Sequence, residues 1–569
     1  MFVRVKKSGN NQYLQIVENK KVSGKVVQRV ISTIGRLDRM QEKGDIETLV
    51  RSLSRYSEKV LIVLSGKSDI DAEAKKIGPV LIFERLWKDL GIKKVLERTL
   101  AGRLFWFDVE RAVFLTVLHR LLVCGSDRFC EKWRRDYRIE GVEEIELHHL
   151  YRAMAFLGEE TLDQAHAAPF SPRCTKDAIE EAMFAHNRNL FSSLDLVFLD
   201  TTSIYFEGEG GEELGKRGFS KDNRPDLNQM VVGVVLDNNG TPLCCEMWPG
   251  NTADVKTTIP VMERIRNRFN AERFCIVADR GMISRQTLDI LDEPENKVRY
   301  ILGERMRNVR EVGEKVLRAP GEFIEVHPEG ASTQDPSPLK VKEVWVEDRR
   351  YIVCLNSKQA RKDAQDRQAI IESLKEKIKS GAKGMIGNKG YRRFVKMQSG
   401  SVSIDMEKVE EEAKYDGIWV LRTNTRLSPK NVALKYKQLW MVEHAFRDMK
   451  TVFLTRPIFH QRDETIRGHV FCSFLALVLR KELYRRLEAA GHSGFEWSDI
   501  KQDLKALQEI TFEENGKKLA VRSQCLGTCG KVFQAVGVAV PPTIREIAGS
   551  PKSECRGSAT GDSCMRNHA

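Results

Sequence analysis

The first 190 residues divide into an alternating part and a helical part. Over residues 1–36, hydrophobic and polar positions alternate and turn, as in YLQIVENKKVSGKVVQRVIST, which predicts a small hairpin domain over 1–70. From about residue 76 the apolar positions recur every three or four residues, which predicts a mainly helical region over 71–190. The segments IGPVLIFERLWKDLGIKKVLERTL, DVERAVFLTVLHRLLV and DAIEEAMFAHNRNLF carry this spacing.

Residues 191–304 predict an α/β core. Helical spacing over 253–269 and 284–293 separates short apolar runs that are typical of buried strands. The predicted order is therefore β-β-β-α-β-α-β, with an aspartate, Asp200 or Asp279, closing the first and the fourth strand. The five runs are LDLVFLD (194–200), QMVVGVVLD (229–237), TPLCCEMW (241–248), FCIVAD (274–279) and RYILGE (299–304).

A second strand-rich tract interrupts this core. Residues 305–427 contain KVKEVWV, RRYIVCLN and GIWVLRTNT around a helical stretch rich in Lys and Arg, which predicts a β-rich insertion. SPKN at 428–431 then starts a helix, and the rest of the core runs over 428–485. Its apolar run VFCSFLALVL is too short to cross a membrane and predicts a buried helix. Residues 486–569 predict a helical region followed by a disordered tail from residue 550.

The charge of the chain indicates a polyanionic partner. Apolar residues make up 41% and charged residues 30%, which is typical of a globular protein. The formal net charge is +13, and residues 1–36 hold eight Lys and Arg against one acid, Glu18. Such an excess favours nucleic acid, so we expect the N-terminal hairpin domain and the helical region to bind DNA.

The N-terminus has basic residues but no apolar stretch of a secretory signal, so a cytoplasmic protein is expected. The twelve cysteines are scattered, which favours free thiols. A zinc site from Cys525, Cys529, Cys555, Cys564 and His568 would have irregular spacing and is a weak match. Cys244 and Cys245 are interpreted as core residues.

Three acids have the placement that phosphodiester chemistry needs. Two divalent ions can activate a nucleophile and stabilise the leaving oxygen, and a few carboxylates on rigid elements suffice to hold Mg²⁺. Asp200 and Asp279 at strand ends and Glu443 on a helix meet that requirement together. Taken singly, each aspartate is more simply a turn or cap residue, and Glu443 a surface acid.

The stretch YKQLWMVEHAFRDMK, residues 436–450, places its polar residues on one side of a predicted helix. At about 100° per residue, Met441, Val442, Ala445 and Met449 form an apolar back. The opposite side could be a solvated surface with ordinary charge pairs. It carries Tyr436, Trp440, Glu443, Arg447 and Lys450.

These residues resemble the DDE transposases of bacterial insertion sequences, in the branch with a β-rich insertion and the signature Y-x2-R-x3-E-x6-K. Tyr436, Glu443 and Lys450 match at the correct spacing, whereas Leu439 stands where the signature has Arg. The tracts DTTSIYFEG, GFSKDNRPDLNQ, PGNTAD, ADRGMIS and RPIFHQRDETIRGHVFCSFLALVL are similar to the same branch. The resemblance implies a ribonuclease H-like core with a mixed five-stranded sheet.

The resemblance also implies the chemistry. Asp200, Asp279 and Glu443 would hold two Mg²⁺ ions, with Mn²⁺ able to replace them, and catalyse cut-and-paste cleavage through a hairpin at the element end, followed by strand transfer. A homodimer would hold both terminal inverted repeats as well as target DNA. The residues expected to contact DNA are Tyr436, Trp440, Arg447, Lys450, Arg280, Lys221 and Arg224. Two histidines, His444 and His469, are interpreted as structural.

Two other functions fit part of the pattern. A metal-dependent nuclease of the same fold would use the three acids, but it would not explain the Tyr436 and Lys450 signature. A domesticated regulator that binds DNA without cutting it would not need all three acids, although Leu439 leaves this alternative open. For Trp440 two roles are open: it could stack on a displaced base, or it could pack against the insertion.

Overall fold

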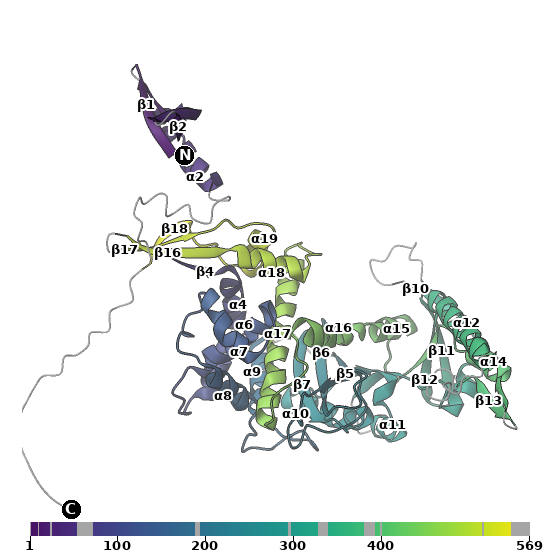
Figure 1. Cartoon of the computed structure of the whole chain (residues 1–569). Coiled ribbons are helices and arrows are strands. Elements are labelled where there is room, and N and C mark those ends of the chain that lie inside the picture. The colour runs from purple at the N-terminus through teal and green to yellow at the C-terminus, as the bar shows by residue number, and fades with distance from the viewer. Residues whose placement is uncertain are drawn as a thin grey trace, which may run out of the picture. The chain divides into compact units, whose positions relative to one another are not determined.

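The computed structural model describes residues 2–9, 11–22, 25–53, 72–187, 194–293, 298–327, 339–379, 393–398, 401–514 and 517–547 (Figure 1). The chain forms two compact units. One contains Met1–Glu73, Ile510–Val521 and Ile544–Ala569, and the other contains Ala74–Glu509 and Arg522–Thr543. The tail expected to be disordered, from residue 550, lies outside the described residues, and the finer division into domains stays a prediction.

The N-terminal segment is a three-stranded antiparallel sheet rather than a single hairpin. Strand β1 (Phe2–Ser8) pairs with β2 (Asn11–Val22), which pairs with β3 (Lys25–Arg36). Two short helices follow, α1 (Leu37–Glu42) and α2 (Asp45–Leu53). The alternating pattern of apolar and polar residues predicted β2 and β3. The same alternation in residues 3–6 accounts for the additional strand, β1.

The sequence predicted a helical C-terminal region, but the structure contains strands there as well as helices. Its helices α18 (Trp497–Ala506) and α19 (Cys529–Val536) alternate with strands. These strands form a four-stranded sheet in the order β18-β17-β16-β4. Their bounds are β4 (Ala72–Lys76), β16 (Gln508–Glu514), β17 (Lys517–Arg522) and β18 (Ile544–Ile547).

Helices dominate residues 78–187, as predicted. Every residue of α6 is buried, because α8 and the long helix α17 (Asp463–Ala489) pack against it. A helix that is buried all round cannot enter a DNA groove, so α6 belongs to the core. The helices are α4 (Gly78–Asp89), α5 (Ile92–Leu100), α6 (Val109–Leu122), α7 (Asp127–Trp133), α8 (Leu147–Gly158) and α9 (Thr175–Asn187).

A mixed sheet forms the centre of the larger unit (Figure 1). Strand β5 pairs antiparallel with β6, which pairs with β7, whereas β8 and β9 run parallel to β5. Helices α10 (Thr258–Arg268) and α11 (Arg285–Asp292) connect the parallel strands. The strands are β5 (Leu196–Tyr205), β6 (Gln229–Asp237), β7 (Pro242–Pro249), β8 (Cys275–Ala278) and β9 (Arg299–Gly303).

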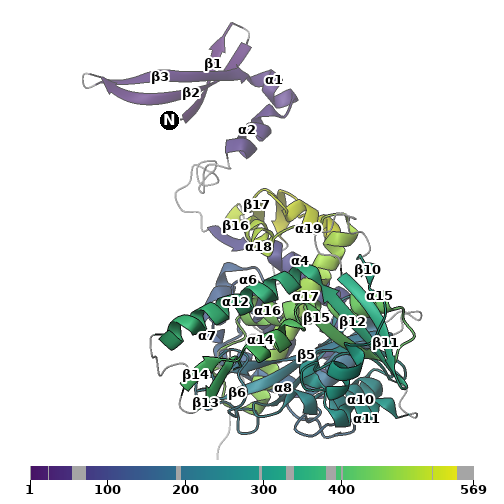
Figure 2. The same ribbon diagram turned by 90° about the vertical axis from the view of Figure 1, so that its right-hand side faces the viewer.

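The insertion lengthens this sheet instead of forming a separate one. Strand β15 pairs antiparallel with β9, and the full order is β10-β11-β12-β15-β9-β8-β5-β6-β7 (Figure 2). The expected five strands are therefore part of a nine-stranded sheet, because the edge of β9 would otherwise leave backbone groups unpaired. The added strands are β10 (Ile324–Val326), β11 (Leu339–Val346), β12 (Arg349–Asn356) and β15 (Ile418–Thr423).

The remaining elements of the insertion pack on one another. Helix α12 (Ser357–Lys379) and helix α14 (Met406–Ala413) cover the short hairpin of β13 (Val395–Gln398) and β14 (Ser401–Ile404). Their buried contacts come from Ile371, Leu374, Phe394 and Val409. The basic surface of α12 explains why the sequence there is rich in Lys and Arg.

The helix that carries the signature is interrupted. Ser428 caps α15 (Pro429–Lys437) by accepting a hydrogen bond from the Asn431 amide, as SPKN predicted. Two residues later α16 (Trp440–Arg447) begins, and a π-helical turn follows over Asp448–Val452. The amides around the break bond three residues back, for example Val442 to the Leu439 carbonyl, so the winding is tighter than the regular helix assumed from sequence.

The buried run VFCSFLALVL lies inside α17, as predicted. Within the described residues, no helix is both long enough and apolar enough to cross a membrane. The ten cysteines that are described are free, and Cys244 and Cys245 are buried core residues.

A closed cluster of charges joins α9, β7 and α10. Arg268 bonds Glu180 at 2.6 Å and Glu246 at 2.9 Å, and all three side chains are buried. Although burial opposes it, Arg268 and Lys176 hold the pKa of Asp177 far below its ordinary value. The cluster balances three cations against three acids: Lys176, Arg264, Arg268, Asp177, Glu180 and Glu246.

We expect Arg268→Met to lower the free energy of unfolding by about 3–5 kcal/mol, because it leaves buried carboxylates without their cation. Urea denaturation followed by circular dichroism measures this. Arg310→Met is the matched control, since its pair with Glu314 is exposed and should contribute less than about 1 kcal/mol. Equal losses for both variants would contradict the role given to the cluster.

Candidate active site

Strand pairing brings Asp200 and Asp279 side by side. Strands β5 and β8 are parallel, and Leu199 pairs with Ala278. The residues that follow this pair are Asp200 and Asp279. Side chains alternate between the faces of a sheet. Phe198 and Val277 lie in the core on the face that α16 covers, so the two aspartates point to that same face.

Glu443 reaches this face from α16. The helix packs on β5 and β6 through Val442, Ala445 and Phe446, which are buried in the same core, while Glu443 itself is exposed. In the described part of the chain, the only three metal-binding side chains whose ligand atoms lie within 4.8 Å of one another belong to a different cluster. The structure thus pairs the two aspartates and holds Glu443 on their side of the sheet, without closing the three carboxylates together.

Asp200 lies in an environment that disfavours its charge. Burial raises the pKa of Asp200 to about 6, and the nearby Asp279 and Asp254 act in the same direction, whereas Lys221 acts against them. Carboxylates that repel one another in a half-buried site are suited to a divalent cation, which prefers oxygen ligands. The donor set formed by Asp200 in the middle of β5 and Asp279 after the end of β8 therefore fits Mg²⁺ or Mn²⁺.

A fourth acid, Asp254, belongs to this site and was not found from the sequence. Its carboxylate accepts a hydrogen bond from the Thr201 hydroxyl at 2.8 Å and pairs with the Lys221 ammonium at 3.2 Å. Lys221 also donates to the Thr201 carbonyl at 2.6 Å. Asp254 is the last residue of the PGNTAD tract, so the resemblance to the family could have pointed to it. Lys221, expected to contact DNA, is occupied by these partners.

Tyr436 contacts Asp279, one of the predicted metal ligands. Its hydroxyl donates to Oδ1 of Asp279 at 2.9 Å. Burial and the charge of Asp279 raise the pKa of the Tyr436 phenol, so the hydroxyl stays protonated and remains a donor. The residue expected to grip a phosphate thus positions Asp279 in this structure.

The other predicted DNA contacts fall into two groups. Lys450 bonds Asp222 at 2.9 Å in a nearly buried pair that Arg456 joins, and Arg224 pairs with Asp226. By contrast, Arg280 and Arg447 are exposed, and neither is paired with a carboxylate among the described residues.

The aromatic and apolar positions of the signature segment differ in exposure. Trp440 is 50% exposed, and its ring meets His444 edge-on, so it remains available for stacking. Leu439 is buried against the core. An arginine at 439 would have to leave this core position, which explains why the chain keeps a leucine there at the expense of the signature.

The separate cluster consists of Asp127, His460 and His469. Nδ1 of His469 lies 3.1 Å from Nε2 of His460 and 2.9 Å from the Arg120 guanidinium. The Arg120 guanidinium already lies within hydrogen-bond distance of Nδ1 of His469, a nitrogen that a metal ion would need. We therefore interpret the cluster as a hydrogen-bonding network that connects α17 with α7. His469 is therefore structural, as its burial also indicates.

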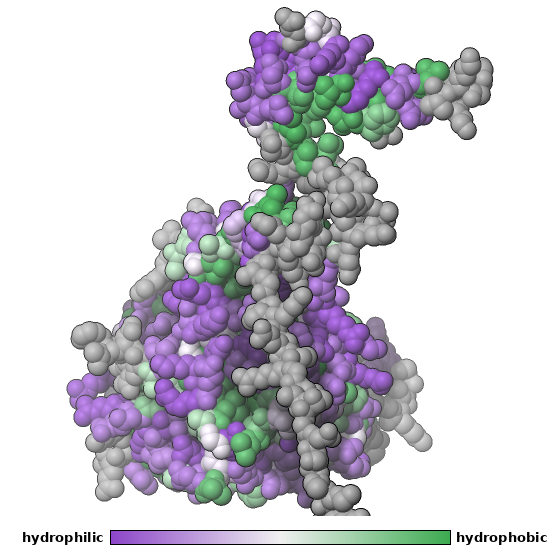
Figure 3. Space-filling model, turned by 90° about the vertical axis from the view of Figure 1, so that its left-hand side faces the viewer, coloured by the Kyte–Doolittle hydropathy of each residue, from purple (hydrophilic) through white to green (hydrophobic). Residues whose placement is uncertain are grey.

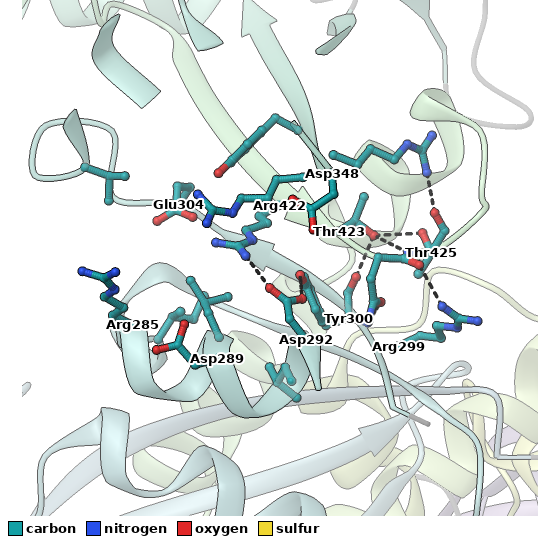
Figure 4. A pocket seen from close by; sticks show the side chains of 18 of the residues that line it. Arg285, Asp289, Asp292, Arg299, Tyr300, Glu304, Asp348, Arg422, Thr423 and Thr425 are labelled. Atoms are coloured by element: carbon teal, nitrogen blue, oxygen red, sulfur yellow. Dashed lines mark hydrogen bonds and ion pairs between the residues drawn. The ribbon is translucent and has the colours of Figure 1, made fainter. Parts of the chain in front are cut away.

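A large cleft of the described structure does not enclose the three predicted acids. It has a volume of about 1600 Å³ and is lined from α11, β9, β12 and β15, and none of the three acids lines it. Figure 4 shows Tyr300 and Arg422 pointing toward Asp292 in this cleft. A smaller hollow of about 350 Å³, lined by Lys221, Asp254 and Phe219, adjoins the acids.

Residues 192–479 match the family model of the transposase DDE domain, and residues 3–67 match that of the IS1634 family transposase, N-terminal domain. The first match covers half of the chain. The chain belongs to the DDE transposases of insertion sequences. Membership implies that this transposase acts on DNA and depends on a divalent metal ion.

A solved piggyBac transposase synaptic complex with hairpin DNA is 12% identical to this transposase, with a TM-score of 0.37. The match covers 75% of this transposase and 79% of the piggyBac chain. That likeness is too low to carry an argument about the fold. No curated protein matches the transposase.

We expect Asp200→Asn to stabilise the metal-free transposase at pH 7. The pKa of Asp200 is about 6 when folded, against about 3.9 when unfolded, so the folded state binds this proton more tightly. Stability from this group is therefore lost as pH rises from about 4 to about 6, and asparagine removes that loss. Thermal melting in EDTA across this pH range measures it.

The same variant separates charge from metal binding. Added Mg²⁺ should raise the melting temperature of the wild type but not of Asp200→Asn, because the ion stabilises only a state that binds it. Asp289→Asn, at an exposed helix position, serves as control. A variant that melts below the wild type at pH 7 would contradict the burial argument.

We expect Tyr436→Phe to weaken Mn²⁺ binding about 10- to 100-fold, because a residue that orients a ligand contributes on that scale. Isothermal titration calorimetry measures the affinity. Tyr300→Phe is the matched control, since Tyr300 also donates to an aspartate, Asp292, but outside the site. Equal affinities for the wild type and Tyr436→Phe would show that the Asp279 contact does not position a ligand.

Proposed function

We propose that this transposase cuts the ends of an insertion sequence and joins them to target DNA, with Asp200, Asp279 and Glu443 as its catalytic acids. The observation that carries the proposal is the pairing of Leu199 with Ala278, which sets two aspartates together on the face under α16. A nuclease of the same fold would also cut, so joining of ends is the property that separates the two functions.

The reaction is a series of phosphodiester exchanges. Water first cleaves one strand at the element end and leaves a 3′-hydroxyl. That hydroxyl attacks the opposite strand, which forms a hairpin and releases the flanking DNA. Reopening of the hairpin by water restores a 3′-hydroxyl, which attacks target DNA. Since each step replaces one phosphate ester bond by another or by water, no nucleotide cofactor is required.

Each residue has a role that follows from its position. Asp200, Asp279 and Glu443 would hold two Mg²⁺ ions, which supply activation of the attacking oxygen and stabilise the leaving one. Tyr436 holds Asp279 in place. Lys221, fixed by Asp254 and Thr201, offsets the charge of Asp200. The exposed Arg280, Arg447 and Trp440 are the side chains free to contact the DNA strand.

Assembly and location complete the proposal. The basic N-terminal residues support binding to the terminal inverted repeats, since a positive surface attracts the DNA backbone. Two ends cut together require two active sites, so we propose a homodimer in the synaptic complex. The enzyme would work in the bacterial cytoplasm at the nucleoid, where its DNA substrates lie.

We expect Glu443→Gln to lower strand cleavage at least 1000-fold while binding to DNA remains within about 3-fold, because the amide keeps the shape but not the charge. Labelled DNA carrying the sequences that flank the gene, incubated with Mg²⁺, reports nicks, hairpins and joined products. Glu488→Gln, an exposed glutamate at the end of α17, is the control. Cleavage without hairpins or joining would favour a nuclease.

A further inference from the structure

The N-terminal sheet has one face partly covered and one face open. Residues paired across antiparallel strands point to the same face. A Cβ at Gly35 would lie 2.8 Å from the sulfur of Met40 in α1, and Gly35 pairs with Leu14, so α1 covers the face of Leu14. Gln15, the next residue, points to the opposite, open face.

The open face carries an array of four polar side chains from all three strands. Arg4 donates from Nη1 to Gln28 at 2.7 Å and from Nε to Gln15 at 3.4 Å. Gln15 in turn donates to the Thr33 hydroxyl at 3.1 Å. Register confirms the shared face, because Arg4 pairs with Gln15 and Gln15 pairs with Thr33. We call Arg4, Gln15, Gln28 and Thr33 the open-face array.

The array is held in position and accessible. Gln28 and Thr33 are exposed, and the guanidinium of Arg4 is fixed between two amide oxygens. Gln28 uses its oxygen for Arg4, and its amide nitrogen has no hydrogen-bond partner among the described residues. These groups are the donors and acceptors that recognise base edges, where arginine suits guanine and glutamine suits adenine.

Charge and shape select the partner. Residues 1–36 hold eight Lys and Arg against one acid, and the lysines Lys6, Lys7 and Lys20 are exposed. Strands lie about 4.8 Å apart. The DNA major groove is about 12 Å wide and admits two paired strands, so two neighbouring strands of this sheet can enter it at a time.

Apolar side chains lie on both faces of this sheet. On the face of Gln15, Phe2 and Val30 are about 40% exposed and pair with the buried Val17. The most exposed valines lie on the other face. Val3, Val5 and Val27 are about half exposed, and they pair with Ile16, Leu14 and Lys20. Figure 3 shows green side chains beside purple ones on the N-terminal sheet. The three valines are therefore on the side of the sheet away from the open-face array.

We propose that the open-face array reads the base sequence of duplex DNA in the major groove, so that a sheet, not a helix, selects the element ends. The inference rests on the proposed function for the identity of the DNA. Arg4, Gln15 and Gln28 contact base edges, while Lys6, which pairs with Tyr13 on the same face, binds a flanking phosphate and helps to set the register.

The test is selection of a randomised duplex library by the full-length transposase in EDTA, which allows binding but no cleavage. The wild type should enrich one motif. Arg4→Ala, Gln15→Ala and Gln28→Ala should each relax the preference at one or two positions, with about 10- to 100-fold lower selectivity. Gln12→Ala, which pairs with Lys7 on the covered face, should keep the motif.

A charge change guards against loss of folding. Gln28→Glu should shift the preference at one position from adenine to cytosine, because a carboxylate accepts from the cytosine amino group. A misfolded sheet cannot acquire a new preference. Enrichment of no motif by the wild type, an unchanged motif in the array variants, or loss of the motif in Gln12→Ala would each overturn the inference.

The proposed function is judged by different measurements. Strand cleavage with Mg²⁺ depends on Glu443, whereas motif selection in EDTA depends on the array. An array variant that loses the motif but still cleaves DNA without sequence preference supports both proposals. A wild type that selects a motif but never cleaves supports the array and removes only the catalytic proposal.

Discussion

The candidate active site depends on the parallel pairing of β5 with β8. That pairing aligns Leu199 with Ala278 and so sets Asp200 beside Asp279. A shift by one residue would turn each aspartate to the opposite face of the sheet, where α10 and α11 pack instead of α16. Parallel strands also need a long crossover, which α10 provides. The chemistry of the site therefore follows from one register.

The larger unit treats buried charge in two opposite ways. Around Arg268 the cations and acids balance, and every carboxylate is paired. Around Asp200 the acids outnumber the cations, because Lys221 is shared with Asp254. The first arrangement holds elements together without affinity for an ion, whereas the second stores repulsion that a divalent cation would relieve. This imbalance lies where the middle of β5 meets the end of β8, which is the candidate active site.

The sequence predicted what short-range rules control. The apolar runs located Asp279 at the end of β8, and SPKN located the start of α15. The prediction that Asp200 ends its strand was wrong, because β5 continues to Tyr205. The sequence could not predict the break before α16, because hydrogen bonds to the third residue back depend on how Leu439 packs into the core. It missed Asp254, since a loop acid becomes part of a site only through the fold that brings it to Thr201.

Sheet pairing was the other limit. The strands of residues 305–427 were visible as apolar runs, but which edge they would join is decided by contacts far apart in sequence. The sheet has nine strands instead of the five predicted, because β15 pairs with the free edge of β9 and brings the other inserted strands with it. The N-terminal strands, by contrast, pair with their neighbours along the chain, and local alternation was enough to reveal them.

The continuous sheet has a mechanical consequence. Leu421 in β15 pairs with Gly303 in β9, and Leu302 pairs with Ala278, which directly precedes Asp279. Backbone hydrogen bonds therefore connect the inserted strands, through β9, to the residue directly before Asp279. A displacement of the insertion relative to the core would thus be transmitted to the backbone that positions this carboxylate.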